Sequence, residues 1–469
     1  MAHSLASQAS RFMRASVVAI VCGSVLSSVS ALAQTAPAPA PPPTPVAFQE
    51  ALLNAANTVF SKANLQGAPD RIPLVIDPLI DGSTGAQSTA TQSMERRIAA
   101  LVRSNYPRFE VTPFTAEAIA KLPVVLIGTF TAINNAAVAG GARDVYRVCL
   151  ALADLKTNRI ISKGATRALP EGIDPTPTTF FAASPAFVRD PATEAYIKNC
   201  QGTRLGDPID QVYVDRIQVA VHVNNGIEAY NAKNYEEALE HFEKARRAPG
   251  GEQLRVFNGL YLANWKLNRR EAAREAFGRI VDFGLEAQRL SVKFLFMPNS
   301  ARFGTDRGVD YTTWVREIAL RTVKAGKCLE VVGHTSATGS ADVNDRLSLQ
   351  RAEYVKGRLH EATLGANATT FVAKGAGSSE LIVGTGRDDA SDALDRRVEF
   401  KTIPCAVPIA KNEKIDRAVR PTRASNGNSA NSRRATEDGE YSALRIPRGI
   451  ESEIQRYLNS GGLRQLMDD

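Results

Sequence analysis

The stretch VVGHTSATGSADVNDRLSLQRAEYVKGRL, Val331 to Leu359, decides the fold of the C-terminal part of this 469-residue chain. It opens as an apolar strand, passes through a short polar loop that contains two glycines, and continues as an amphipathic helix. In the helix, Ala352, Val355 and Leu359 recur at i, i+3 and i+7, so we expect this face to pack on a sheet.

Three polar residues of the same helix form a second stripe. Asn344, Ser348 and Arg351 recur at i, i+4 and i+7, which places them together in its first turns. Because a helix N-terminus offers unpaired N–H groups and partial positive charge, adding a guanidinium there predicts a carboxylate receptor. The alternative is a surface arginine that pairs with Asp345 or another acid.

The whole stretch resembles the signature of the OmpA-like peptidoglycan-binding domain, roughly GHTD…G…N..LS..RA..V...L. The resemblance implies that Arg351 holds the carboxylate of diaminopimelate in the peptidoglycan stem peptide. It also implies that Thr335 and Ser336 in the loop and Arg397 near the end of the domain belong to the site. His334 matches the motif too, and we interpret it as a structural hydrogen-bonding residue.

The chain departs from the family pattern where the ligand's ammonium should bind. The family has an aspartate directly after GHT, and Ser336 stands there, which supplies no charge. The family's aspartates in the first strand are replaced by residues 294–297, Phe-Leu-Phe-Met. Asp342 and Asp395 are the candidates for the missing negative charge. The resemblance therefore implies the fold more firmly than the ligand.

Strands and helices alternate over residues 290–405, which predicts a two-layer α/β sandwich. The expected strands are LSVKFLFM (290–297), CLEVVGHT (328–335), ATTFVAKGAG (368–377) and DRRVEFKTI (395–403), and the expected helices are 311–325 and 344–362.

Residues 213–286 have a helical pattern that resembles tetratricopeptide repeats. Small and aromatic residues fall at the spacings of that repeat, and a second copy follows 35 residues later. The residues concerned are Gly226, Tyr235, Ala238, Phe242 and Ala245, then Ala273 and Phe277. A plain helical hairpin that links two domains is the alternative.

Residues 48–205 alternate helical and strand patterns and predict an N-terminal α/β domain. It resembles the family that includes the penicillin-binding-protein activator LpoB, the curli secretion protein CsgG and the flagellar protein FlgO. The segments that carry this resemblance are VIDPLIDGSTG (75–85), VVLIGTF (124–130) and the hairpin LALADLKTNRIISKG (150–164). The predicted fold class is thus multi-domain α/β.

The two ends of the chain have compositions that do not predict packed cores. Residues 1–33 combine arginines, a short apolar run and small residues before Gln34, which is typical of a cleaved signal peptide. Residues 34–47 are Ala/Pro-rich and predict an extended linker. Residues 406–469 are polar and predict a disordered basic tail with a short helix at IESEIQRYL.

Four cysteines remain after the signal peptide, and an exported chain can form disulfides. Pairing Cys149 with Cys200 and Cys328 with Cys405 keeps both bonds within domains. Four cysteines allow three pairings, and the sequence does not choose among them. Small buried thiols are an equally good interpretation.

The net charge of +8 suits an acidic glycan or anionic lipid, and the export signal argues against nucleic acid. No nucleophile, phosphate-loop or metal-ligand motif is present, so we predict no enzyme, no cofactor and no metal site. We expect a periplasmic, cell-wall-associated protein of a Gram-negative envelope that binds peptidoglycan, recruits envelope proteins and associates with the outer membrane. The alternative is a scaffold or activator of a wall-synthesis or envelope-assembly enzyme, with weak or no wall binding.

Overall fold

The computed structural model describes residues 44 to 405 with short internal gaps at 66, 137–142, 188, 298–299, 305–309, 364–369 and 387–390. The predicted signal peptide, most of the linker and the predicted tail lie outside the described residues. The last part of the predicted linker is already paired, because Val46 forms a parallel bridge to Ala168. Among the described helices, none combines the length and apolar character that a membrane span requires.

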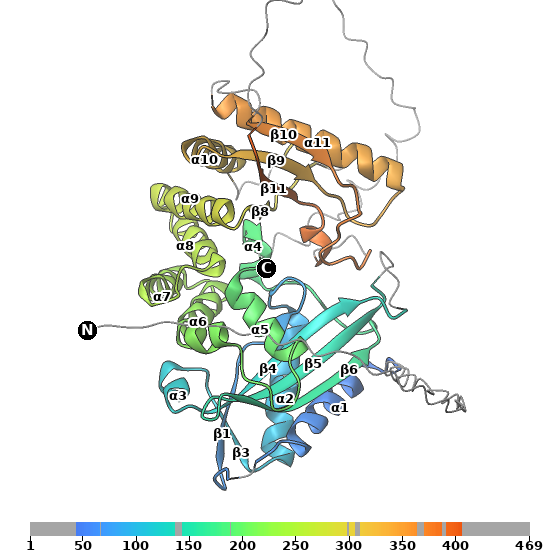
Figure 1. Cartoon of the computed structure of the whole chain (residues 1–469), viewed down its shortest axis with the longest axis vertical. Coiled ribbons are helices and arrows are strands. Elements are labelled where there is room, and N and C mark those ends of the chain that lie inside the picture. The colour runs from blue at the N-terminus through green and yellow to red at the C-terminus, as the bar shows by residue number, and fades with distance from the viewer. Residues whose placement is uncertain are drawn as a thin grey trace, which may run out of the picture. The chain divides into compact units, whose positions relative to one another are not determined.

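The first sheet is mixed, in the order β3-β1-β4-β5-β6, with β2 beside β4. Strands β3, β1 and β4 run parallel to one another, and β4, β5 and β6 form an antiparallel meander (Figure 1). The strands are β1 (Ile72–Ile76), β2 (Ile80–Asp81), β3 (Phe109–Thr112), β4 (Val124–Ile133), β5 (Val145–Asp154) and β6 (Arg159–Ala168). The helices of this part are α1 (Phe48–Ser61), α2 (Thr89–Asn105), α3 (Ala116–Ala120) and α5 (Pro191–Gln201).

Strand β4 is buried along nearly its whole length because both faces of the sheet are covered. Leu126 and Phe130 join the core under α1 and α2, whereas Val125 and Ile127 join a second core with residues of α5 and α6 (Gln211–Asn231). The alternation of side chains along a strand therefore produces two separate cores.

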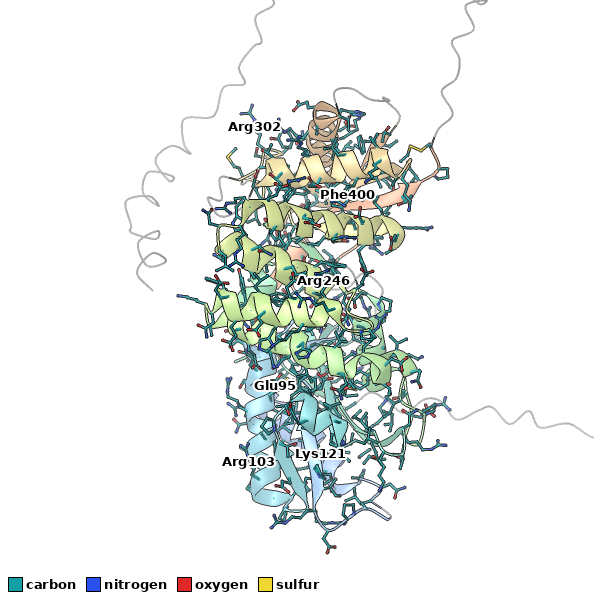
Figure 2. The ribbon with its side chains drawn as sticks, turned by 90° about the vertical axis from the view of Figure 1, so that its left-hand side faces the viewer. Glu95, Arg103, Lys121, Arg246, Arg302 and Phe400 are labelled. Atoms are coloured by element: carbon teal, nitrogen blue, oxygen red, sulfur yellow. A yellow bond between two sulfur atoms is a disulfide. The ribbon has the colours of Figure 1, made fainter. Side chains whose placement is uncertain are left out.

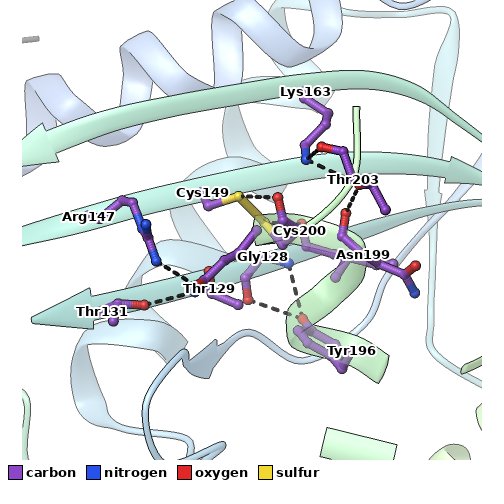
Figure 3. Close-up of a disulfide and its surroundings, with 12 residues drawn as sticks. Gly128, Thr129, Thr131, Arg147, Cys149, Lys163, Tyr196, Asn199, Cys200 and Thr203 are labelled. Carbon is purple, nitrogen blue, oxygen red and sulfur yellow. Dashed lines mark hydrogen bonds between the residues drawn. A yellow bond between two sulfur atoms is a disulfide. The ribbon is translucent and has the colours of Figure 1, made fainter. Parts of the chain in front are cut away.

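Two disulfides join the four cysteines that follow the predicted signal peptide. The pairing is the one that keeps each bond within a predicted domain. Cys149 on β5 is bonded to Cys200 on α5, which fastens that helix to the sheet (Figure 3). Beside this bond the Tyr196 hydroxyl accepts a hydrogen bond from the Gly128 amide at 3.1 Å. Cys328, the first residue of β9 (Cys328–Gly333), is bonded to Cys405 after the last strand.

Four antiparallel helices connect the two sheets, and Figure 2 shows them side by side. They are α6 (Gln211–Asn231), α7 (Tyr235–Arg247), α8 (Leu254–Lys266) and α9 (Arg270–Glu286). The ring of Phe242 on α7 is fully buried between α6 and α8. A β-carbon at Gly226 or at Gly259 would approach this ring to 2.9 or 2.5 Å, so both positions require glycine.

The second sheet has the order β10-β9-β11-β8-β7. Strands β9 and β10 are parallel, and β11 runs antiparallel between β9 and β8. Ala352, Val355 and Leu359 are fully buried, which confirms the predicted apolar face, and Phe400 lies in the same core (Figure 2). The elements are β7 (Ala186–Phe187), β8 (Arg289–Val292), β9 (Cys328–Gly333), β10 (Phe371–Gly375), β11 (Val398–Ile403), α10 (Tyr311–Lys324), α11 (Ala341–Ala362) and the 3₁₀ turn η1 (Ser391–Leu394).

The strand expected over 290–297 is wrong in its extent. It ends at Val292, because the chain then folds back on itself with hydrogen bonds from Met297 N to Arg302 O and from Gly304 N to Leu295 O. Leu295 is left 37% exposed by this turn.

A short segment from the predicted N-terminal domain completes the second sheet. After helix α4 (Thr179–Ala183), strand β7 pairs antiparallel with β8, so that Ala186 lies opposite Val292. The stretch between β6 and α5 therefore packs with the C-terminal sheet. The mixed α/β class is confirmed, whereas the domain boundaries at 205, 213 and 290 stay predictions.

Truncation of Phe242 tests whether this ring holds the four helices together. We expect Phe242→Ala to lower the free energy of unfolding by about 3–5 kcal/mol in urea denaturation, because it leaves a cavity bounded by two glycines that cannot fill it. Val323→Ala, on an exposed side chain of α10, should change it by no more than about 0.5 kcal/mol. Equal small effects would contradict the assigned role of Phe242.

Candidate ligand-binding site

The predicted site lies where β9 and β10 end and the first half of α11 crosses them. Gly333 ends β9 and Gly375 ends β10, and both touch the backbone of the helix. A β-carbon at Gly333 would come within 2.1 Å of the Ser348 carbonyl oxygen, and one at Gly375 within 2.8 Å of the Leu349 nitrogen. The two glycines therefore allow α11 to rest directly on the strand ends.

The polar stripe of α11 is present, but two of its members face the protein. Asn344 and Ser348 are 5% and 0% exposed. The Asn344 amide nitrogen donates to the Thr338 carbonyl oxygen at 3.0 Å. The Ser348 hydroxyl accepts a hydrogen bond from Gly377 N at 2.9 Å and donates to the Asp345 carbonyl oxygen. They fasten the loops after β9 and β10, and a direct ligand contact from either stays a prediction.

Arg351, the third member of the stripe, lies against the segment that follows β8. Its guanidinium carbon is 4.8 Å from the centroid of the Phe296 ring, a cation–π geometry. Its Nε donates to the Ser300 carbonyl oxygen at 3.3 Å. Only 7% of the residue is exposed. The plane of the guanidinium is therefore fixed by two groups that the sequence reasoning did not assign to the site.

The two loop residues differ in how their hydroxyls are used. The Thr335 amide donates to the Gly377 carbonyl oxygen at 2.9 Å, but its buried hydroxyl finds no hydrogen-bond partner among the described residues. The Ser336 hydroxyl lies 3.1 Å from that of Thr338. Because a buried hydroxyl without a partner is costly, Thr335 is a polar group that a ligand could satisfy.

Of the two candidates for the missing negative charge, Asp395 is engaged by backbone amides. The Asp395 carboxylate accepts hydrogen bonds from the amides of Ile382, Val383 and Gly384, at 2.6, 2.9 and 2.8 Å. Burial raises its pKa, and these amides oppose that shift. Asp342 is exposed in the first turn of α11. Asp395 thus organises the loop that follows β10.

Arg397 is engaged in a buried ionic network rather than exposed at the site. Its Nε donates to the Glu399 carboxylate at 2.8 Å, and the Arg289 side chain donates to the same carboxylate at 2.9 Å. Arg397 also donates to the Glu380 carbonyl oxygen. It therefore supports β8 and β11, and its predicted contact with a ligand stays a prediction. Arg396, its neighbour, is only partly buried.

The backbone amide of His334 donates a structural hydrogen bond to the Arg397 carbonyl oxygen at 3.0 Å, whereas its ring does not serve that role. Both ring nitrogens are buried without a hydrogen-bond partner in the described part of the chain, and the nearest Glu399 oxygen is 3.8 Å away. Burial, reinforced by the Arg397 charge, lowers the pKa of His334 to about 3, so the ring stays neutral. Although His334, Glu380 and Glu399 could bring three ligand atoms together, two arginines already hold Glu399, and we assign no metal there.

Arg143, which lies just before β5 of the first sheet, contacts the loop that follows β10. Arg143 donates to the carbonyl oxygens of Ile382, of Val383 at 3.0 Å and of Leu381 at 3.3 Å. The same loop is held from its other side by Asp395. Sequence reasoning missed this contact because Arg143 and the loop are far apart in the chain and no periodic pattern links them.

The chain matches no protein-family model, and no curated protein matches it. Several solved structures are similar to about a quarter of it. The peptidoglycan-associated lipoprotein from Burkholderia pseudomallei is 26% identical over 24% of this chain and 89% of its own, with a TM-score of 0.20. The cell wall anchor of the T6SS from Pseudomonas aeruginosa is 22% identical over 27% and 96%, at 0.22. The OmpA-like domain of FopA1 from Francisella tularensis is 20% identical over 25% and 75%, at 0.20.

The Glu399 network makes stability depend on pH in a defined direction. Burial alone would raise the pKa of Glu399, but the hydrogen bond from Arg289 and the charge and hydrogen bond of Arg397 outweigh it and lower the pKa to about 2. Because the carboxylate is favoured in the folded state, its stabilising contribution is present above its ordinary pKa of 4.5 and is lost as the pH falls toward 2.

We therefore expect Glu399→Gln to lower the free energy of unfolding at pH 7 and to lower it much less at pH 3. Denaturant titrations at both pH values measure this difference. Glu353→Gln, at a half-exposed carboxylate on α11, is the matched control and should show no such pH dependence. An equal effect of Glu399→Gln at pH 7 and pH 3 would contradict the network.

Proposed function

We propose that this chain is a non-enzymatic protein of the Gram-negative periplasm that binds peptidoglycan non-covalently through residues 290–405. One observation carries the proposal: Arg351 lies in the motif GHT…N…LS..RA, beside loops that Asn344 and Ser348 hold in place. We further propose that residues 48–205 and 213–286 recruit envelope proteins and that the protein associates with the outer membrane.

The proposed mechanism follows from the chemistry of a guanidinium. Its planar fork matches the two oxygens of a carboxylate, and a charge-assisted pair in a partly dry site is stronger than one in water. Phe296 and Ser300 fix the orientation of Arg351 before a ligand arrives. The carboxylate of diaminopimelate in a stem peptide would accept from Arg351, and the Thr335 hydroxyl would contact the same ligand.

A second candidate function follows from the charge at position 336. Ser336 supplies no carboxylate for the ligand's ammonium, and Asp395 is committed to backbone amides. Because an unpaired ammonium loses a charge-assisted bond, wall binding would be weak or absent. The chain would then act as a scaffold or as an activator of a wall-synthesis or envelope-assembly enzyme.

Replacing Arg351 tests the main proposal. We expect Arg351→Ala to abolish co-sedimentation of the full chain with purified peptidoglycan sacculi, because the carboxylate loses its partner. Arg346→Ala removes an exposed arginine from the same helix and should leave co-sedimentation unchanged. Thermal unfolding of both variants shows whether the fold survives. A folded Arg351→Ala protein that sediments like the wild type would exclude this site.

Restoring a carboxylate at position 336 separates the two candidates. If the serine weakens wall binding, Ser336→Asp should raise the association constant for sacculi, measured by co-sedimentation, by roughly tenfold, which corresponds to about 1.4 kcal/mol. Ala337→Asp, one residue along the same loop, is the control. Strong wild-type binding without any gain in Ser336→Asp would argue against the scaffold candidate.

A further inference from the structure

A cavity lies outside the predicted peptidoglycan site. It is a cavity of about 360 Å³ between the first sheet, the segment that carries α4 and β7, helix α8 and the loop before β11. Figure 1 shows α4 beside α8 and next to β8. The volume of the cavity lies in the range of about 300–1,000 Å³ that is usual for small-molecule sites.

Aromatic side chains from two parts of the chain line this cavity. Phe130 and Tyr146 come from the first sheet, and Phe180, Phe181 and Phe187 come from α4 and β7. The cavity reaches the surface, because Ala182 and Leu295 also line it and are exposed. Such walls suit an apolar body that enters from solvent.

One cation in these walls has no carboxylate partner in the part of the chain that the structure describes. Lys293 follows β8, and its ammonium group donates to the carbonyl oxygen of Ala182. Burial lowers the pKa of Lys293 to about 8, so it remains mostly charged at neutral pH. Lys293 is partly buried, and an anionic ligand would offset the cost of a partly buried cation without a counter-ion.

The two carboxylates of the cavity each accept hydrogen bonds from backbone amides, and neither forms an ion pair with Lys293 among the described residues. Asp81 accepts hydrogen bonds from the amides of Ser83 and Thr84, at 2.9 and 2.7 Å. Asp190 caps α5 through the Thr193 amide at 2.9 Å and also accepts from Leu254 N. Arg255 and Arg396 line the same cavity. The lining therefore holds more cationic side chains than carboxylates.

We propose that this cavity binds a small amphiphile, an apolar molecule with a single carboxylate or other oxyanion, whose head contacts Lys293. The aromatic walls hold the apolar body, and Arg255 adds positive charge beside it. This site is separate from Arg351 and does not depend on the proposed function.

Two dyes with the same ring system test the proposal on the full chain. 1-Anilinonaphthalene-8-sulfonate has an apolar body and one anionic group, and N-phenyl-1-naphthylamine lacks the sulfonate. We expect saturable binding of the sulfonate dye by fluorescence titration. Lys293→Gln should weaken it about tenfold and leave the neutral dye unchanged, whereas Lys324→Gln, at an exposed lysine of α10, should change neither.

A blocking variant tests the place of binding. Ala182 lines the cavity and Ala183, equally exposed and next to it, does not. Ala182→Trp should abolish saturable binding of both dyes, and Ala183→Trp should preserve it, with thermal unfolding as the check on the fold. No saturable binding by the wild type, or equal binding by the two tryptophan variants, would overturn the proposal. An equal loss of both dyes in Lys293→Gln would overturn the role of the charge. Arg351→Ala should bind the dyes like the wild type, which separates this site from the wall-binding site.

Discussion

The close approach of α11 to the ends of β9 and β10 is the constraint on which the candidate site depends. Gly333 and Gly375 have no side chain to keep the helix away, so Ser348 reaches the amide of Gly377 and Asn344 reaches the loop after β9. Once these loops are fixed, the register of the helix also fixes where Arg351 lies. A larger residue at either glycine would displace the helix backbone itself, because the contacts are with backbone atoms.

The sequence was sufficient to predict elements whose pattern is local. The apolar face of α11 and the burial of Phe242 follow from helical spacing, and the structure has both. The same spacing could not show that Asn344 and Ser348 face inward, because a polar stripe looks alike whether it meets water or loop backbone. Helical spacing also could not predict the contacts of Arg351 with Phe296 and Ser300, because they depend on how the chain turns after Val292.

The charged residues near the second sheet differ in whether they have a partner of opposite charge. Glu399 forms ion pairs with Arg289 and Arg397, and this network stabilises the sheet while it buries Arg397. His334 lies beside it as a neutral ring. Lys293, one residue beyond β8, has only a carbonyl oxygen as its described partner. The sequence does not distinguish a charged residue that is ion-paired from one that is not, because the partners are brought together only by the tertiary fold.

Strand β7 has a consequence for how the protein can be divided. Ala186 and Phe187 cover the outer edge of β8, although residues 188–288, which include the five helices α5 to α9, separate the two strands. A fragment that starts after residue 205 would leave unpaired the N–H and C=O groups of β8 that face β7, whereas those that face β11 would stay paired. Such an open edge recruits strands from other molecules, so an excised C-terminal module would tend to self-associate even with its own core intact.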